Sequence, residues 1–294
     1  MKILITCPPM LNMIDNFDSL LKKYNLDYDA PNIVQTMSEK KLMEMLPSYD
    51  GWIIGDDPAT RNVFEAGASG KLRAAIKWGI GTDNVDFKAC KDLNIKIINT
   101  PDMFGSEVSD IAITYIIGLA RSTYYIDRKV RIGEWPKIAG ITLKDKNIGV
   151  VGFGDIGKNV ASRLKAMDMN VTIYDPSFSA EGFKEFVLGG YSLAEWPEKV
   201  EKKDFIFLCC ALSKTSHHII NKETIKLMKQ GVRIINVGRG GLIDEGALEN
   251  GLKNEHIHSV ALDVFENEPP DIKSFLVNHP FSILGSHNAS NTID

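Results

Sequence analysis

Residues 147–176 read NIGVVGFGDIGKNVASRLKAMDMNVTIYDP. The run Ile148–Val151 is short, apolar and rich in β-branched residues, which predicts a buried strand. Three glycines follow with the spacing G-x-G-x-x-G: Gly152, Gly154 and Gly157. Apolar residues then recur at helical intervals, and a second β-branched run ends at Asp175. The stretch therefore predicts a strand, a glycine-rich turn, a helix and a second strand, in that order.

Each glycine in this pattern has a physical task. Gly152 allows a tight turn out of the strand, Gly154 lets backbone N–H groups approach a pyrophosphate, and Gly157 lets the helix pack close to the sheet. The helix that begins around Asp155 and Ile156 offers unpaired N–H donors and its positive dipole end to an anion. Glycines at this spacing also occur in ordinary turns. Because all the surrounding elements arrive in the right order, we interpret the stretch as a dinucleotide-binding site.

Asp175 indicates which dinucleotide is bound. It lies eighteen positions after Gly157, where a carboxylate accepts a hydrogen bond from a ribose 2′-hydroxyl. A site for NADP usually places an arginine just after the second strand, to bind the 2′-phosphate. Here residues 176–178 are Pro, Ser and Phe, and the carboxylate would repel a phosphate. We therefore expect NAD as the cofactor.

Composition excludes several classes of partner. The chain has 294 residues, of which 44% are hydrophobic and 24% charged, as in ordinary globular proteins. Its 34 basic and 38 acidic residues nearly balance, so we expect no nucleic-acid partner. No apolar run reaches membrane-spanning length, and the first residues lead into a predicted strand rather than a signal peptide. We expect a cytoplasmic protein with no membrane partner. The cysteines lack C-x-x-C spacing and are predicted to be buried thiols, with no metal site: Cys7, Cys90, Cys209 and Cys210.

Strands and helices alternate along the whole chain, which predicts an α/β fold with parallel sheets. Residues 1–98 are expected to form a smaller, flavodoxin-like substrate-binding domain, with strands near 2–7, 52–55, 74–78 and 96–99. Residues 99–288 are expected to form a Rossmann-type, doubly wound NAD-binding domain. Between the two sets of strands, residues 106–131 show a helical pattern without a proline or a cap, so one long helix is expected there.

Three reactive side chains follow strands of the second domain. Ligands bind beyond the carboxyl ends of the strands in such sheets, and these residues meet that condition: Arg239, Glu268 and His287. An imidazole can take the hydroxyl proton during hydride transfer, a carboxylate orients it, and an arginine binds a substrate carboxylate bidentately. From spacing alone, Arg239 could instead pair with Asp244, and Glu266 is as available as Glu268. Only its place at a strand end favours His287 among the six histidines.

Six further segments make a family resemblance specific. They read KWGIGTDNVD (77–86), INTPD (98–102), RIGEW (131–135), INVGRGGLIDEGALENGLK (235–253), ALDVFENEPP (261–270) and SHNASNT (286–292). The chain resembles the D-isomer-specific 2-hydroxyacid dehydrogenase family, and its phosphoglycerate dehydrogenase-like members in particular. Members usually continue past the last segment with a helix that crosses back to the substrate domain. We expect the tail 289–294 to return toward that domain.

The resemblance assigns roles to the three reactive residues. It implies that Arg239 binds and polarises a 2-oxo acid, and that His287 is the acid/base. It also implies that Glu268, rather than Glu266, pairs with His287. The implied reaction interconverts a 2-oxo acid and a D-2-hydroxy acid, with a hydride passing between the nicotinamide and C2 of the substrate.

The resemblance also implies binding residues. Asp263 is expected to contact the nicotinamide carboxamide. Backbone around Gly79, Ile80 and Gly81 is expected to meet the substrate carboxylate, where residues without a Cβ allow close approach. Further positions are expected to line the cofactor: Cys210, Val237 and Gly238. The chain departs from the usual pattern at Ser286, where the family has proline, at Phe104, where many members have asparagine, and at Cys210-Ala211.

Two further expectations concern whether the protein is an enzyme or a binding protein, and whether it forms a homodimer. Relatives that act as NAD(H)-sensing corepressors share these motifs, so a binding protein is the alternative to an enzyme. The predicted helix 106–131 is apolar on more than one face, and Trp135 follows it, so we expect a homodimer through the cofactor domain. The apolar positions are Ile111, Ile113, Tyr115, Ile116, Ile117, Leu119 and Ala120.

Overall fold

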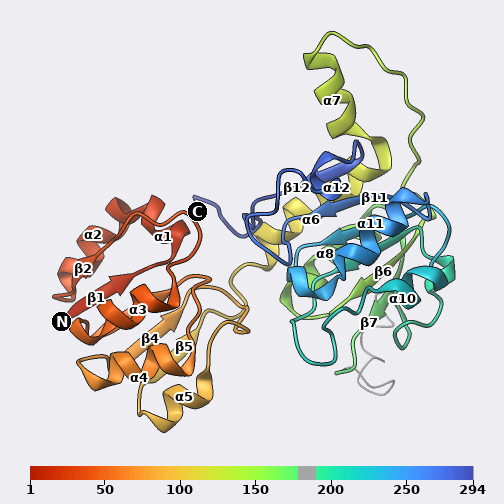
Figure 1. The fold of residues 1–294 in the computed structure, drawn as a ribbon. Helices are drawn as coiled ribbons and strands as arrows, with labels where there is room; N and C mark the ends of the chain where they lie inside the picture. The colour runs from red at the N-terminus through yellow and green to blue at the C-terminus, as the bar shows by residue number, and fades with distance from the viewer. Residues whose placement is uncertain (178–189, 294) are drawn as a thin grey trace. The chain divides into compact units, whose positions relative to one another are not determined.

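The computed structural model describes residues 1–177 and 190–293 of the chain. The chain divides into two units, Met1–Met103 and Phe104–Asp294, each built around its own parallel sheet (Figure 1). This confirms the predicted α/β fold with two domains. The division follows Met103, five residues beyond the end expected from the sequence, and Ala289 is buried in the core of the second unit. We describe each unit by itself.

The first unit has a five-stranded sheet with the order β2-β1-β3-β4-β5. This is the flavodoxin-like order, in which the chain reverses direction across the sheet between β1 and β3. Two groups of buried apolar side chains, one with α3, α4 and α5 and one with α1 and α2, show that helices cover both faces. The strands are β1 (Lys2–Ile5), β2 (Asp27–Asp29), β3 (Gly51–Ile54), β4 (Ala74–Lys77) and β5 (Lys96–Asn99). The helices are α1 (Pro8–Asn12), α2 (Ile14–Lys23), α3 (Glu39–Met45), α4 (Arg61–Ser69) and α5 (Phe87–Asp92).

The second unit has a seven-stranded sheet with the order β12-β11-β10-β9-β6-β7-β8. Every pair of neighbouring strands is parallel, and the order reverses between β6 and β9, as in a Rossmann fold. The strands are β6 (Asn147–Val151), β7 (Asn170–Tyr174), β8 (Ser192–Leu193), β9 (Phe205–Leu208), β10 (Val232–Asn236), β11 (Ile257–Leu262) and β12 (Ser282–Leu284). The helices are α6 (Gly105–Arg121), α7 (Thr123–Arg131), α8 (Asp155–Ala166), α10 (Lys222–Leu227), α11 (Glu245–Lys253) and α12 (Phe275–Asn278).

The register of this sheet sets the position of the site. Val151 lies opposite Tyr174 on one side and Leu208 on the other, so the residues that follow these strands emerge at one level. Likewise Leu262 lies opposite Asn236 and Leu284. Because all the strands are parallel, their carboxyl ends form a single edge.

The predicted single helix over 106–131 was wrong. It is two helices, α6 and α7, separated by Ser122, which has a left-handed backbone with φ of 54°. The side chain of Tyr124 lies against Gly118, where a Cβ would come 2.9 Å from its ring. Helix α6 is buried against its own sheet and packs on α8. By contrast, α7 has no buried residue and stands away from the body of its unit (Figure 1).

Several short elements have no counterpart in the sequence predictions: α1, β2, β8, α10 and α12. They are two to six residues long, too short for a hydrophobic period to show. Within residues 1–177 and 190–293, no helix is both long and apolar enough to cross a membrane.

Candidate active site

The three glycines after β6 occupy three different environments. Gly152 has φ of 99°, and a Cβ there would lie 2.7 Å from the backbone of Cys210. Gly157 packs so closely that a Cβ would lie 2.2 Å from the carbonyl oxygen of Gly152. A Cβ on Gly154 would meet nothing within 4 Å. The structure therefore needs Gly152 and Gly157 for the turn and for helix packing, whereas Gly154 keeps open the space before α8.

Asp175 directly follows β7, at the same edge of the sheet. One carboxylate oxygen accepts the N–H of Phe153 in the glycine loop, at 2.6 Å. The other accepts the N–H of Ser177, at 2.9 Å. The carboxylate is thus held beside the glycine loop, where a ribose would follow a pyrophosphate. Residues 178–189 lie outside the described residues. They include Phe178, one of the three residues after Asp175 among which the sequence has no arginine for a 2′-phosphate.

The loops after β9 and β10 complete this part of the edge. Cys210 is half-buried, and its backbone touches the turn at Gly152. Val237 and Gly238 are buried, and their conformation is fixed by Asn236, which is fully buried at the end of β10. The Asn236 side chain accepts the N–H of Gly238 at 3.0 Å and donates to the carbonyl of Arg239 at 2.9 Å. Sequence reasoning did not single out Asn236, although a polar residue ending a buried strand was the available signal.

These residues fit a bound NAD. Gly154 leaves a cradle that a Cβ would fill, at the start of a twelve-residue helix whose first N–H groups can meet a pyrophosphate. The acid at the end of β7 suits the ribose hydroxyls. Gly152, Gly154, Asp155, Ile156 and Gly157 would hold the phosphates, and Asp175 the ribose. Cys210, Val237 and Gly238 lie on the loops that follow the next two strands of the edge.

His287 and Glu268 form a pair after β12 and β11. The Nδ1 of His287 lies 2.8 Å from Oε2 of Glu268, and both side chains are about one-fifth exposed, at 22% and 21%. The other oxygen of Glu268 accepts the N–H of Phe265 at 3.0 Å, which orients the carboxylate. Glu266, the alternative acid, instead lies 2.6 Å from Nε2 of His218. The structure thus gives the two glutamates different histidine partners.

Arg239 lies on the loop that touches the Glu268 segment. Its neighbour Gly240 packs so closely that a Cβ would lie 1.9 Å from the carbonyl group of Phe265. The alternative partner of Arg239, Asp244, uses its carboxylate to accept the N–H of Ala247 at the start of α11. An arginine and a carboxylate-bound imidazole therefore occur on contacting loops of the second unit.

Asp263 is almost fully buried, at 3% exposed, at the end of β11. One carboxylate oxygen accepts the N–H of Ala289 at 3.0 Å, and the other lies 3.3 Å from the hydroxyl of Tyr115. Its carbonyl oxygen accepts the N–H of His287 at 2.7 Å. The structure places Asp263 against the loop that carries His287.

In the first unit, the segment Gly79–Gly81 follows β4. Gly79 has φ of 127°, and its N–H donates to the hydroxyl of Thr100 at 2.8 Å. Among the residues that the structure describes, the N–H groups of Ile80 and Gly81 have no hydrogen-bond partner. Two adjacent N–H donors on a loop at a sheet edge suit a carboxylate.

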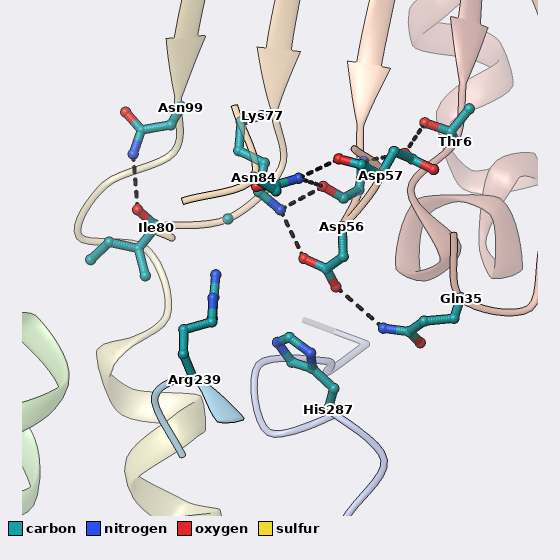
Figure 2. A network of polar contacts seen from close by, with 12 residues as sticks. Thr6, Gln35, Asp56, Asp57, Lys77, Ile80, Asn84, Asn99, Arg239 and His287 are labelled. Carbon is teal, nitrogen blue, oxygen red and sulfur yellow. Dashed lines mark hydrogen bonds and ion pairs between the residues drawn. The ribbon is translucent and has the colours of Figure 1, made fainter. Parts of the chain in front are cut away.

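A buried polar network lies beside this segment in the same unit (Figure 2). Lys77, 2% exposed, donates to the carbonyl of Gly55 at 2.6 Å and to Asp56 at 3.0 Å. Asn84 donates to the carbonyls of Gly55 and Asp57. The carboxylate of Asp57 accepts from Thr6 and from two backbone N–H groups, and burial raises its pKa. The network ties the ends of β1, β3 and β4 together.

Comparisons with known proteins agree with this architecture. A family model described as D-isomer specific 2-hydroxyacid dehydrogenase, NAD binding domain, matches residues 113–289. Over 259 residues the chain is 33% identical to D-3-phosphoglycerate dehydrogenase 2, chloroplastic, of Arabidopsis thaliana, covering 87% of this chain and 41% of that protein. It is 34% identical over 255 residues to hydroxypyruvate reductase of Thermotoga maritima, covering 85% of this chain and 79% of that protein.

A solved structure, that of D-lactate dehydrogenase from Escherichia coli without ligand, superposes with a TM-score of 0.83 at 26% identity. It covers 100% of this chain and 91% of that one. The chain spans about half the length of the curated phosphoglycerate dehydrogenases it matches. These matches confirm the predicted family, fold class and NAD cofactor: the chain belongs to the D-isomer specific 2-hydroxyacid dehydrogenase family of NAD-binding oxidoreductase enzymes.

Proposed function

We propose that the protein interconverts a small 2-oxo acid and a D-2-hydroxy acid, with NAD as the redox cofactor. The observation that carries this proposal is the 2.8 Å contact between Nδ1 of His287 and Glu268 at the carboxyl edge of the second sheet. A carboxylate in this position fixes the orientation of the ring and favours its protonated form. Such an imidazole can exchange a proton with a substrate oxygen near neutral pH.

The protein's own groups would divide the work as follows. Bound NADH supplies the hydride for C2 of the substrate. Because Nδ1 of His287 binds Glu268, Nε2 is the nitrogen that gives a proton to the C2 oxygen in reduction and takes it back in oxidation. The planar guanidinium of Arg239 suits bidentate binding of the 2-oxo acid. Within the first unit, the N–H groups of Ile80 and Gly81 are the candidates for binding a carboxylate.

A screen of 2-oxo acids with NADH tests this proposal. We expect absorbance at 340 nm to fall with at least one short 2-oxo acid, and the product to be the D enantiomer. The rival reading is an NAD(H)-sensing binding protein. It predicts NADH binding by calorimetry without consumption of NADH by any acid in the panel. That outcome would reject the dehydrogenase proposal and retain the sensor.

Charge at the edge of the first sheet favours a substrate without a phosphoryl group. The connections that follow its five strands span residues 6–7, 30–38, 55–60, 78–86 and 100–103. They contain no lysine or arginine and five aspartates: Asp56, Asp57, Asp83, Asp86 and Asp102. Lys77, at the end of β4, is buried and engaged by Gly55 and Asp56, and Arg61, the first residue of α4, is engaged by Asp86 and Asp92. A phosphoryl group carries nearly two negative charges at neutral pH and would be repelled here.

The similar proteins include phosphoglycerate dehydrogenases, named for a phosphorylated acid, and a hydroxypyruvate reductase, named for an unphosphorylated one. We propose the unphosphorylated class over the phosphoglycerate dehydrogenase-like alternative. The test compares kcat/KM for hydroxypyruvate and 3-phosphohydroxypyruvate. We expect at least a roughly tenfold preference for hydroxypyruvate, equivalent to about 1.4 kcal/mol. A preference for the phosphorylated acid would reject this choice while leaving the dehydrogenase proposal intact.

We also propose a homodimer that forms through α7 and the segment after it. Helix α7 buries no residue within its own unit, and three large side chains nearby are exposed: Val130 at 42%, Ile132 at 69% and Trp135 at 74%. Exposed apolar groups of this size often mark an interface. Ile116, expected from sequence to face the partner, is fully buried in the core of its own unit.

Light scattering would test this assembly. A mass near 32.7 kDa, that of one chain, would reject the dimer. If a dimer forms, Ile132→Asp and Trp135→Ala should weaken it without lowering the thermal stability of the monomer. A dimer unaffected by both changes would place the interface elsewhere.

We also propose that the protein works in a reducing compartment such as the cytoplasm. All four cysteines are free thiols, and Cys7 and Cys90 are buried. Burial raises the pKa of each of these two thiols to about 12, which keeps them protonated and unreactive at neutral pH. Cell fractionation would test the location.

A further inference from the structure

Asp263 contacts the loop that carries His287 at two points. Its backbone carbonyl accepts the N–H of His287 at 2.7 Å, and its carboxylate accepts the N–H of Ala289 at 3.0 Å. Between β12 and His287, Gly285 lies against the same carboxylate, since a Cβ there would come 2.0 Å from Oδ1. Asp263 therefore holds the loop on both sides of the histidine.

Tyr115 contacts the carboxylate oxygen of Asp263 that does not bind Ala289. It lies on α6, 148 residues earlier in the chain, and is 6% exposed. Its hydroxyl lies 3.3 Å from Oδ1 of Asp263 and would be 2.4 Å from a Cβ on Gly285. Burial, together with the negative charge of Asp263, raises the pKa of Tyr115, so its hydroxyl stays protonated and donates to the carboxylate.

The backbone of His287 explains why such support is needed. Its φ is 54°, in the left-handed region that residues other than glycine seldom adopt. A residue holds such a conformation only when the surrounding structure enforces it. In this conformation the imidazole reaches Glu268.

We propose that Tyr115 and Asp263 form a clamp that holds the His287 loop in this conformation, which makes Tyr115 a positioning residue for the acid/base. The inference rests on the proposed function for what the imidazole does, and on the geometry alone for how it is held. It also gives Asp263 a task beyond the nicotinamide contact that the family resemblance implies. Both oxygens of its carboxylate already bind groups of the protein.

A double-mutant cycle separates positioning from a general effect on stability. Tyr115→Phe removes only the hydroxyl, and we expect kcat for the best 2-oxo acid to fall roughly three- to thirty-fold, because small displacements of a catalytic group have large effects on rate. The Kd for NADH should not change. In a His287→Gln background the same change should have almost no further effect, since the clamp acts through the imidazole. The matched control is Tyr174→Phe. Tyr174 is also buried, but its hydroxyl donates to the backbone carbonyl of Glu198, at 2.7 Å.

A second measurement, by NMR spectroscopy, tests the position of His287 without depending on turnover. In protein labelled with 13C-histidine, the Cε1–H signal of His287 is identified by its loss in His287→Gln. Tyr115→Phe should shift or broaden this signal, and Tyr174→Phe should leave it in place. An unmoved His287 signal, or an equal loss of kcat in both backgrounds of the cycle, would overturn the clamp. If no 2-oxo acid is reduced, the proposed function fails, and the signal of His287 still decides whether Tyr115 positions it.

Discussion

Replacing Asp175 by alanine should change which cofactor the protein prefers. In the structure one carboxylate oxygen of Asp175 accepts the N–H of Phe153, and the other accepts the N–H of Ser177. A bound ribose would add hydrogen bonds to the same carboxylate. The substitution therefore removes the ribose contact, the support of the glycine loop and the negative charge that repels a 2′-phosphate.

The size of the effect follows from these losses. A hydrogen bond to a charged group contributes about 1.5–3 kcal/mol. Since each 1.4 kcal/mol is a factor of ten, the Kd for NADH should rise roughly ten- to a hundred-fold. The Kd for NADPH should stay level or fall, because the repulsion is lost together with the contact. The preference for NADH over NADPH should therefore shrink by at least about tenfold.

Calorimetric titration of NADH and NADPH into both proteins measures this ratio. Asp204→Ala is a matched control, because Asp204 also accepts a backbone N–H, that of Asn147 at 2.9 Å, but at the start of β6 rather than in the loop after it. The control should lower thermal stability and leave the ratio unchanged. Equal affinities of the unaltered protein for the two cofactors would refute the reasoning. So would an equal loss of both in Asp175→Ala.

Three further predictions follow from the site and its unit. Glu268→Gln removes the charge that favours the protonated imidazole, so the pH profile of 2-oxo acid reduction should shift toward acid, whereas Glu266→Gln should leave the profile in place; equal profiles in both variants would count against the pair. Gly154→Val should keep its melting temperature but bind NADH at least roughly tenfold more weakly, while Gly157→Val should lose stability, because its Cβ would lie 2.2 Å from a carbonyl oxygen. Burial lowers the pKa of His279 below its ordinary value of 6.5, so on acidification the unfolded chain binds the proton first and the folded protein should lose stability below about pH 6.5. In melting curves recorded at several pH values, His279→Phe should flatten this loss of stability, and an unchanged slope would assign the loss to other groups.

The dinucleotide unit could be predicted in full because its requirements are local. A tight turn, an open approach and close packing each depend on one glycine at a fixed distance from a strand. The break in the long helix could not be predicted in the same way. Ser122 has no intrinsic preference for the left-handed region, and its conformation is accompanied by packing between Tyr124 and Gly118.

The partner of His287 shows the same limit at the site. Spacing could not choose between Glu266 and Glu268, because the path of the bent segment 266–269 decides which carboxylate faces which histidine. In the fold, contact between Gly240 and Phe265 sets the path of that chain. Asp263 was assigned to the cofactor by resemblance, whereas its bonds to the His287 loop depend on contacts between segments far apart in sequence.

The central claim is that His287 carries the proton in a 2-oxo acid reduction supported by NADH. The most direct test measures kcat of His287→Gln with saturating 2-oxo acid, alongside calorimetric binding of NADH. The account predicts an unchanged Kd for NADH and a fall in kcat of roughly two to four orders of magnitude, the usual contribution of acid–base catalysis. Turnover equal to that of the unaltered protein would contradict it.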